Sequence, residues 1–230
     1  MATLYSPKIV TNGLVMYLDA GNNRSYAGSG TTWSDLSRNG ITGTLTNGPT
    51  FNSANGGSIV LDGTNDYIDC ADLEIFKIST TLTLEAWFRI STYVNWAGIL
   101  GKSNVATGVY VMHLSPLAQK IRFSYNSSTP WNVNVIDGNS TISTNQWYHS
   151  VITSNGSLVN FYLNGALDKT QSISITFNTG AGFPVSIGQD PPGSNEFFNG
   201  RIALAKIYNR TLSASEVLQN YHATKGRFGL

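Results

Sequence analysis

Cysteine and charge are both scarce in this 230-residue sequence. Because Cys70 is its single cysteine, the chain cannot form an intrachain disulfide, and a hydrophobic core has to stabilise the fold. Charged residues make up 12% of the sequence, against roughly 25% in ordinary soluble domains, and the net charge is +1. This charge balance gives no attraction to nucleic acid or to an anionic membrane surface. We therefore expect no nucleic-acid partner.

Long apolar runs are missing as well. No stretch approaches the ~18 consecutive apolar residues of a membrane-spanning helix. In the opening MATLYSPKIVTNGLVMYL the apolar residues are interrupted at Pro7, Lys8, Thr11 and Asn12, so this stretch does not match a signal peptide. We expect neither a signal peptide nor insertion into a membrane.

The sequence is rich in short segments that alternate apolar and polar residues. In TLTLEAWFRI the apolar residues recur at every second position from Leu82 to Ile90, which predicts a strand. The segment QWYHSVITSNGSLVNFYLNGALDKTQS predicts three strands joined at Asn155-Gly156 and Asn164-Gly165, dipeptides typical of tight hairpin turns. Further strand candidates are GLVMYLD, SIVLD, YIDC, AGILGK, VYVMHL, KIRFSY, PVSIG and RIALAKIY.

About a dozen short strands without helical spacers predict an all-β fold of two packed antiparallel sheets. All-β units of about 200–250 residues commonly form one domain, so we expect a single domain over residues 1–230, with a core at 13–222 and a C-terminal tail at 223–230. The side chains expected to face inward are Leu82, Leu84, Phe88, Val151, Phe161, Ile187 and Ile207. The polar loop over residues 19–57 is expected to be ordered, because it carries regularly placed Tyr26, Trp33, Leu36, Leu45 and Phe51.

One helix is predicted near the C-terminus. Ser213 and Glu216 match the S-x-x-E pattern of a capping box, and Gly226 would end the helix. A helix of about a dozen residues is marginal in isolation. We therefore expect Val217, Leu218 and Tyr221 to pack against the sandwich.

The tail after this helix combines positive charge with large apolar side chains. It could dock into the groove of a neighbouring molecule, with Phe228 and Leu230 as anchors and Arg227 pairing with an acidic group. The alternative is that the tail folds back on its own domain. The first alternative makes Arg227, Phe228 and Leu230 an assembly element.

Six segments resemble, in order and spacing, the laminin-G-like jelly-roll domains of the concanavalin A-like lectin and glucanase superfamily. They are GLVMYLDAG, SIVLDGTNDYIDC, TLTLEAWFRI, QWYHSVITSNGSLVNFYLNG, VSIGQD and FFNGRIALAKIYNRTLSASEV, which together cover about residues 13 to 222. The resemblance implies a two-sheet antiparallel jelly-roll sandwich with one short C-terminal helix. The loop DAGNNRSYAGSGTTWSDLSRNG and the tail NYHATKGRFGL resemble more specifically laminin-G-like domains in structural proteins of tailed bacteriophages.

Two functions follow from this resemblance as expectations. The first is a non-enzymatic virion structural protein, a capsid decoration or a tail or fibre component. Its location would be the virion, its partners would be further copies of itself and other virion proteins, and it would also contact cell-surface glycans. The alternative is a secreted or surface carbohydrate-binding lectin module, extracellular and calcium-dependent.

No catalytic motif is found. Glucanases of the superfamily resemble one another in a strand with Glu-x-Asp-x-(x)-Glu, which pairs two carboxylates, whereas Glu85 stands alone in its strand. His113, His149 and His222 lack a second ligand at metal spacing, and no G-x-S-x-G motif occurs. We expect no enzymatic activity.

Calcium is the cofactor that the sequence favours. Hard cations bind oxygen donors from converging loops. LDGTND offers Asp62 and Asp66, and IGQDPPGSNE offers Gln189 and Asp190, whose GQD also resembles the calcium loop of pentraxins. The alternative is that these carboxylates cap their own turns.

Two tryptophans in polar loops are candidate carbohydrate-binding residues. Trp96 and Trp131 have neighbouring amides at Asn95 and Asn132, and an exposed aromatic ring beside amide groups is suited to stacking against a sugar. The alternative is that both rings pack beneath a loop.

Overall fold

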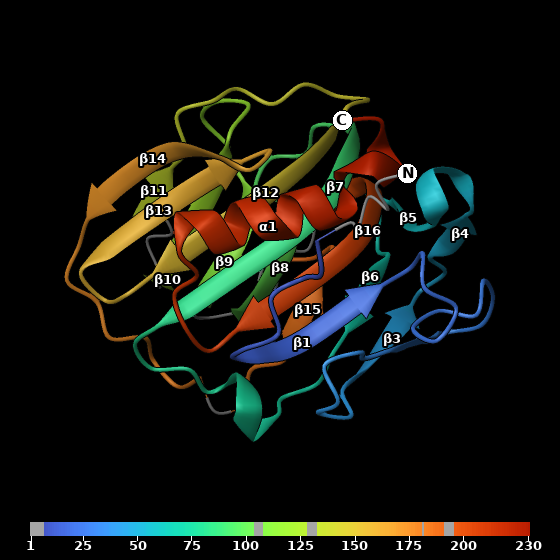
Figure 1. Ribbon diagram of the computed structural model, residues 1–230, viewed down its shortest axis with the longest axis horizontal. Coiled ribbons are helices and arrows are strands. Elements are labelled where there is room, and N and C mark those ends of the chain that lie inside the picture. The colour runs from blue at the N-terminus through green and yellow to red at the C-terminus, as the bar shows by residue number, and fades with distance from the viewer. Residues whose placement is uncertain (1–6, 104–107, 128–132, 181, 191–195) are drawn as a thin grey trace, which may run out of the picture.

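Two antiparallel sheets face each other in the computed structural model, which describes residues 7–103, 108–127, 133–180, 182–190 and 196–230 (Figure 1). The first sheet has the order β14-β13-β12-β7-β16-β5-β4, with β1 also paired to β16. The second sheet has the order β11-β10-β9-β8-β15-β6-β3-β2. These two sheets and one short C-terminal helix confirm the predicted sandwich.

The first sheet contains β1 (Leu14–Asp19), β4 (Thr50–Asn52), β5 (Ser58–Asp62), β7 (Leu82–Thr92), β12 (Trp147–Ser154), β13 (Leu158–Leu163), β14 (Ala166–Ser172) and β16 (Asn199–Tyr208). The second contains β2 (Thr32–Ser34), β3 (Thr42–Thr46), β6 (Tyr67–Asp69), β8 (Gly98–Ser103), β9 (Gly108–Leu114), β10 (Ile121–Ser127), β11 (Val135–Asp137) and β15 (Val185–Ile187). The helices are α1 (Ala214–Thr224) and three 3-10 turns, η1 (Ala54–Gly56), η2 (Glu74–Phe76) and η3 (Lys225–Phe228).

The hairpin between β13 and β14 shows how local sequence determines the topology. Asn164 and Gly165 have φ values of 50° and 79°, the left-handed conformation that a tight turn of this kind needs at both positions. Strand β13 pairs with β14 on one side and with β12 on the other. The predicted meander of three strands is confirmed.

Six of the seven predicted inward residues lie in the core between the sheets: Leu82, Leu84, Phe88, Phe161, Ile187 and Ile207. The prediction for Val151 is wrong. Val151 pairs with Glu85 across β12 and β7 and packs on the outer face of the first sheet with Val217 and Tyr162. It is buried there because α1 covers this face, so alternation alone did not distinguish the two covered faces.

Helix α1 crosses the outer face of the first sheet over β12 and β7 (Figure 1). It begins after the predicted capping box, in which Ser213 accepts from the Glu216 backbone N–H and the Glu216 carboxylate accepts from the Ser213 N–H. Val217 is fully buried as predicted, but Leu218 is 42% exposed and that prediction is wrong. The stripe facing the sheet runs through Val217, Asn220 and Thr224, at helical spacing, and Leu218 lies beside it.

The loop over residues 19–57 is ordered, as predicted. Tyr26, Trp33 and Leu45 are buried. Three strands not predicted from the sequence lie within it, since β2 and β3 extend the second sheet and β4 extends the first. Each of the three is only three to five residues long, too short for alternation to be recognised.

A buried polar group, here called the Glu85 cluster, joins α1 to the sheet. The carboxylate of Glu85 accepts from Lys206 Nζ at 2.7 Å, His149 Nε2 at 3.0 Å and Asn220 Nδ2 at 2.7 Å. Tyr208 completes the cluster by accepting from Asn220 and donating to the carbonyl of Val10. Burial raises the pKa of Glu85, but the charge of Lys206 and the hydrogen bond from His149 outweigh it and hold the pKa at about 2.

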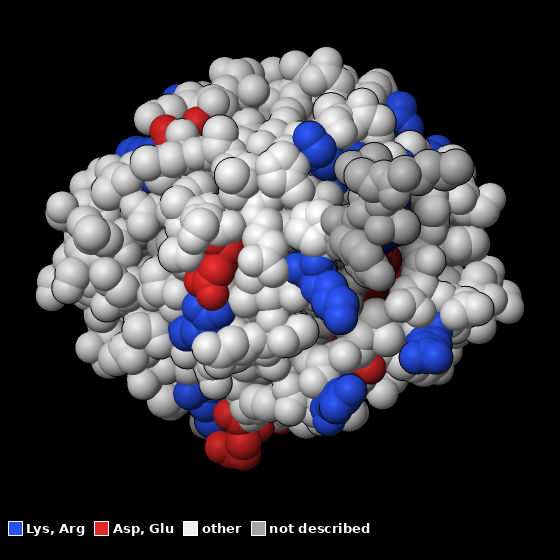
Figure 2. Space-filling view, in the orientation of Figure 1, with Lys and Arg blue, Asp and Glu red and all other residues white. Residues whose placement is uncertain are grey.

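Figure 2 shows the face of the molecule over α1, where charged side chains of both signs are scattered among uncharged ones. None of the described helices has the length and apolar character needed to span a membrane.

Candidate functional site

Trp96, one of the predicted carbohydrate-binding residues, lies in the loop between β7 and β8. Its side chain is partly buried, and its indole stacks on the imidazole of His113 with centroids 5.4 Å apart and planes 14° apart. The guanidinium carbon of Arg122 lies 5.0 Å from the indole ring. Asn95 is exposed beside it, whereas Trp131 and Asn132 lie outside the described residues.

The strands beneath Trp96 hold His113 and Arg122 side by side. These residues pair directly across β9 and β10. Their neighbours Met112 and Phe123 point into the core, so His113 and Arg122 point to the outer face of the second sheet. Both therefore contact the indole from the sheet side.

Hydrogen bonds fix the residues under the indole. Arg122 donates to both oxygens of Asp137, through Nε at 2.6 Å and Nη2 at 2.7 Å, and His113 Nε2 lies 2.6 Å from the Ser124 hydroxyl. Burial, together with the charge of Arg122, lowers the pKa of His113 to about 3, so its ring is neutral. We call Trp96, His113, Arg122, Ser124 and Asp137 the Trp96 cluster; it carries no net charge, because His113 is neutral and Arg122 pairs with Asp137.

The backbone at Trp96 is also held in an uncommon conformation. Its φ is 64°, which costs a bulky non-glycine residue of order 1 kcal/mol or more. The Trp96 N–H donates to the carbonyl of Leu114, and the Tyr93 hydroxyl donates to the carbonyls of Ser115 and Ala118. These hydrogen bonds hold the loop against the end of β9 and the β9–β10 connection, and they place the indole over the sheet.

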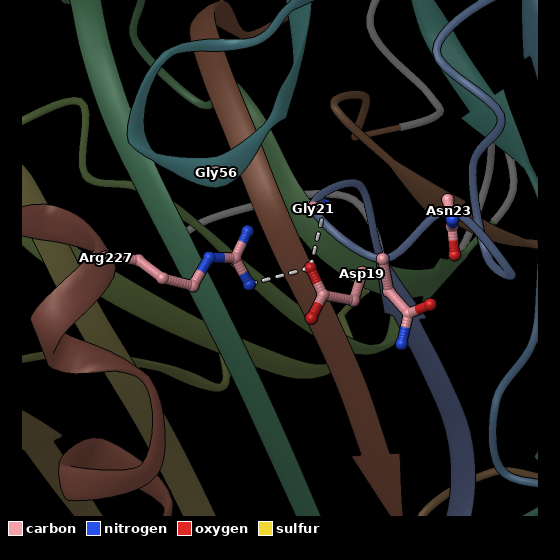
Figure 3. Close-up of a pocket in the computed structure, with 6 residues that line it drawn as sticks. Asp19, Gly21, Asn23, Gly56 and Arg227 are labelled. Carbon is pink, nitrogen blue, oxygen red and sulfur yellow. Dashed lines mark hydrogen bonds and ion pairs between the residues drawn. The ribbon is translucent and has the colours of Figure 1, made fainter.

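A second surface feature is an open hollow of about 620 Å³ beside the C-terminal segment (Figure 3). It is lined by Asp19, Gly21, Asn22, Asn23, Gly56 and Arg227. The guanidinium of Arg227 extends from the tail and donates to Asp19 Oδ1 at 2.8 Å. The hollow thus lies where the N-terminal loop and the end of the chain meet.

The tail follows the second of its two predicted alternatives at Arg227 and Phe228. Phe228 is 7% exposed and stacks on Trp87 at 4.1 Å, and it also contacts Trp147 at 4.7 Å. The expectation that Phe228 anchors in a neighbouring molecule is therefore corrected, because its own domain supplies an aromatic socket on the outer face of the first sheet. Leu230 is 46% exposed, and its role in assembly stays a prediction.

The sequence of this sandwich matches a known protein family. The family model for the concanavalin A-like lectin/glucanases superfamily, of the laminin-G type, matches residues 62–218. The chain belongs to this superfamily.

Solved structures with this fold are similar over nearly the whole chain. Domain 4 of AbnA, an extracellular arabinanase from Geobacillus stearothermophilus in complex with arabinotriose, is 20% identical with a TM-score of 0.66, covering 90% of this chain and 98% of that domain. The binding domain of Paraclostridial Mosquitocidal Protein 1 is 18% identical with a TM-score of 0.69, covering 92% and 52%.

The binding domain of botulinum neurotoxin DC in complex with SialylT is 14% identical with a TM-score of 0.69, covering 94% and 52%. This chain thus spans about half the length of the two toxin domains. At these identities the likeness shows a shared lectin-like jelly-roll fold. No curated protein sequence matches the chain.

The predicted calcium ligands lie in two places, at the end of β5 with the turn that follows it and directly after β15. Asp62 Oδ1 accepts from the Thr64 N–H at 2.8 Å and Asp66 Oδ2 from the Asp62 N–H at 3.2 Å, so both carboxylates cap their own turn. Gln189 and Asp190 follow β15, where Asp190 is 8% exposed. Among the described residues no group of three or more His, Cys, Asp or Glu side chains is arranged to hold a metal.

The side chain of Asp190 has an unfavourable setting for a carboxylate. Burial, together with the charge of Glu196, raises its pKa to about 8. Ser103 Oγ lies 3.5 Å from Asp190 Oδ1.

Glu85, which stands alone in its strand, is not accessible to a polysaccharide. Its side chain is fully buried beneath α1, and both its oxygens are occupied by the Glu85 cluster. Its role is to dock the helix.

Sequence reasoning missed four residues of the Trp96 cluster: His113 as a stacking partner, Arg122, Ser124 and Asp137. The alternation in KIRFSY places Arg122 on the outer face. Its pairing with Asp137 depends on the register of β10 with β11, which no local pattern reveals.

Proposed function

We propose that this protein is a non-enzymatic carbohydrate-binding domain whose ligand stacks on Trp96. The observation that carries the proposal is the partly buried indole held over His113 and Arg122. Because its rotation is already restricted, the ring loses little entropy when a ligand stacks on it. The strained φ of Trp96 agrees with this role, since such conformations cluster at ligand sites.

The chemistry around the ring suits an uncharged sugar. The Arg122 charge is neutralised by Asp137 and His113 is neutral, while the exposed amide of Asn95 adds hydrogen-bonding capacity. Structural neighbours support the proposal: one was solved with arabinotriose and another with SialylT.

The experiment is a glycan array followed by calorimetry on the best sugar. Trp96→Ala should weaken binding about thirtyfold or more, because truncating an aromatic anchor costs about 2 kcal/mol or more. Leu167→Ala is the matched control, since Leu167 is an exposed apolar residue, 58% accessible, on β14 of the other sheet. Unchanged affinity in Trp96→Ala, with a sugar bound, would refute the site.

The biological setting is proposed from the sequence resemblance. We propose a virion structural component, in capsid, tail or fibre, that assembles as a homo-oligomer with other virion proteins, with an extracellular lectin module as the alternative. An electron-microscopy image of a particle labelled through this chain would test the first. Sedimentation of the purified protein tests self-association, and a strict monomer would contradict it.

Calcium is proposed as a weaker addition, at Asp190 and Gln189. Its support is the buried carboxylate of Asp190, whose raised pKa a bound cation would reverse. Calcium at 100 times its dissociation constant should stabilise the fold by about 2.7 kcal/mol. An unfolding midpoint that is equal in calcium and in chelator would refute calcium binding.

A further inference from the structure

The hollow beside Arg227 is assembled from three segments that are distant in the sequence. Asp19 ends β1, Gly56 belongs to η1 and Arg227 belongs to η3 (Figure 3). Arg227 reaches across to Asp19, and Asn23 lies on the far side of that carboxylate. The tail therefore supplies one wall of the hollow.

Two glycines shape the slot that holds the guanidinium. A Cβ atom at Gly21 would lie 2.2 Å from Arg227 Nη2 and 2.2 Å from the Gly56 carbonyl, and a Cβ at Gly56 would lie 2.9 Å from Arg227 Nε. Glycine at both positions leaves room for the Arg227 guanidinium because it has no side chain. The position of Arg227 is thus fixed by the shape of the slot as well as by its ion pair.

Arg227 and Asp19 retain hydrogen-bonding capacity at the hollow. Arg227 donates to Asp19 Oδ1 at 2.8 Å, with weaker contacts to the carbonyls of Gly57 at 3.3 Å and Asn55 at 3.4 Å. A guanidinium has five N–H donors, so two remain. Asp19 Oδ1 also accepts from the Gly21 N–H, and Asp19 Oδ2 accepts from the Tyr17 hydroxyl, which leaves one free lone pair, on Oδ2.

The amides of the loop add further groups. Asn22 Oδ1 accepts from the Arg24 N–H, while Asn22 Nδ2 and the whole side-chain amide of Asn23 make no hydrogen bond within the described part of the chain. Donors and acceptors thus line one hollow, and among the described residues that line it only Arg227 and Asp19 are charged, with charges that cancel.

We propose that this hollow is a second ligand site, separate from the Trp96 cluster, and that it binds a neutral polyhydroxylated unit, a sugar residue. A hydroxyl both donates and accepts, so it matches the mixed lining. An anion would face the Asp19 carboxylate and a cation would face the Arg227 guanidinium. The volume of about 620 Å³ lies within the range of about 300–1,000 Å³ for small-molecule sites.

This inference gives the C-terminal segment a function within its own domain. Arg227 completes the wall of the hollow, and Phe228 holds the segment against Trp87. The site does not depend on the proposed stacking at Trp96, so the two can be tested separately.

The test is an NMR titration of the full chain with neutral trisaccharides (arabinotriose, maltotriose and chitotriose), with trigalacturonate as the anionic probe. The backbone amides of Gly21 and Gly56 and the side-chain amides of Asn22 and Asn23 should shift with a neutral sugar. Asn23→Ala should weaken this binding about fivefold, the loss expected for one neutral hydrogen bond. Asn12→Ala is the matched control, because Asn12 is also an exposed asparagine but lies outside the hollow.

Trp96→Ala separates the two proposals. Shifts at the hollow that persist in Trp96→Ala establish the second site even if the Trp96 cluster binds nothing. The inference is overturned if the hollow resonances stay unshifted with all neutral sugars, if trigalacturonate alone shifts them, or if Asn23→Ala binds as the unmodified chain does.

Discussion

Replacing Glu85 by alanine should destabilise the fold more than any surface change, although the strand would tolerate alanine. The substitution leaves Lys206 charged and fully buried, and it removes the acceptor for His149 and Asn220. Two strands and the helix α1 lose their common partner at once.

The magnitude follows from the burial of the whole group. Breaking a buried ion pair from one side typically costs about 3–5 kcal/mol, because an uncompensated charge remains in the interior. Both Glu85 and Lys206 have 0% exposed side chains, so solvent cannot screen the remaining charge. We expect Glu85→Ala to lie within this range.

Urea unfolding followed by tryptophan fluorescence measures the effect. Glu74→Ala is the matched control, because the Glu74 side chain is 87% exposed in its pair with Lys77 and should change stability by less than about 0.5 kcal/mol. The double variant Glu85→Leu with Lys206→Met should recover much of the loss, since replacing both partners by apolar residues is often close to neutral. A loss under about 1 kcal/mol for Glu85→Ala would refute the structural role assigned to this cluster.

Three further predictions concern stability. Phe161→Ala should cost about 3–5 kcal/mol, because Phe161 is 2% exposed between the sheets, and a loss below about 1 kcal/mol would contradict that position. Phe228→Ala should lower the free energy of unfolding by about 3 kcal/mol in the same urea assay and leave sedimentation unchanged. A variant of normal stability that no longer self-associates would instead show that Phe228 docks into a neighbouring molecule. Asp190→Asn should stabilise the protein, measured in chelator, more at pH 8 than at pH 4. Folding raises the pKa of Asp190 from 3.8 to about 8, so the unmodified protein loses stability as the pH rises between these values. Equal effects of the substitution at both pH values would refute the burial of this carboxyl group.

The sandwich could be predicted from the sequence because its signals are local. Alternation in β7 and the Asn164-Gly165 turn each act within a few residues. The error at Val151 has a different origin, since α1 covers the outer face of the first sheet and both phases of β12 are therefore buried. Leu218 was misplaced because Asn220, a polar residue, takes the buried position and bonds to Glu85.

The candidate sites were less predictable because their residues meet through register. Trp96 could be singled out from its polar loop, but the grouping of His113, Arg122 and Asp137 beneath it depends on how β9, β10 and β11 pair. Likewise Arg227 could be recognised as unusual at the end of the chain. Its partner Asp19 lies 208 residues away, at the end of β1.

The placement of α1 determines which face of the sandwich is closed to solvent. The helix and the tail close the outer face of the first sheet, where Glu85, Trp87 and Val151 are all buried. On the second sheet, α1 does not cover His113 and Arg122, and Trp96 lies over these two side chains instead. Arg227 belongs to η3, directly after α1, so the hollow opens beside the point where the covering helix stops. The docking of α1 through the Glu85 cluster therefore closes the outer face of the first sheet, and both proposed ligand sites lie outside the area that the helix covers.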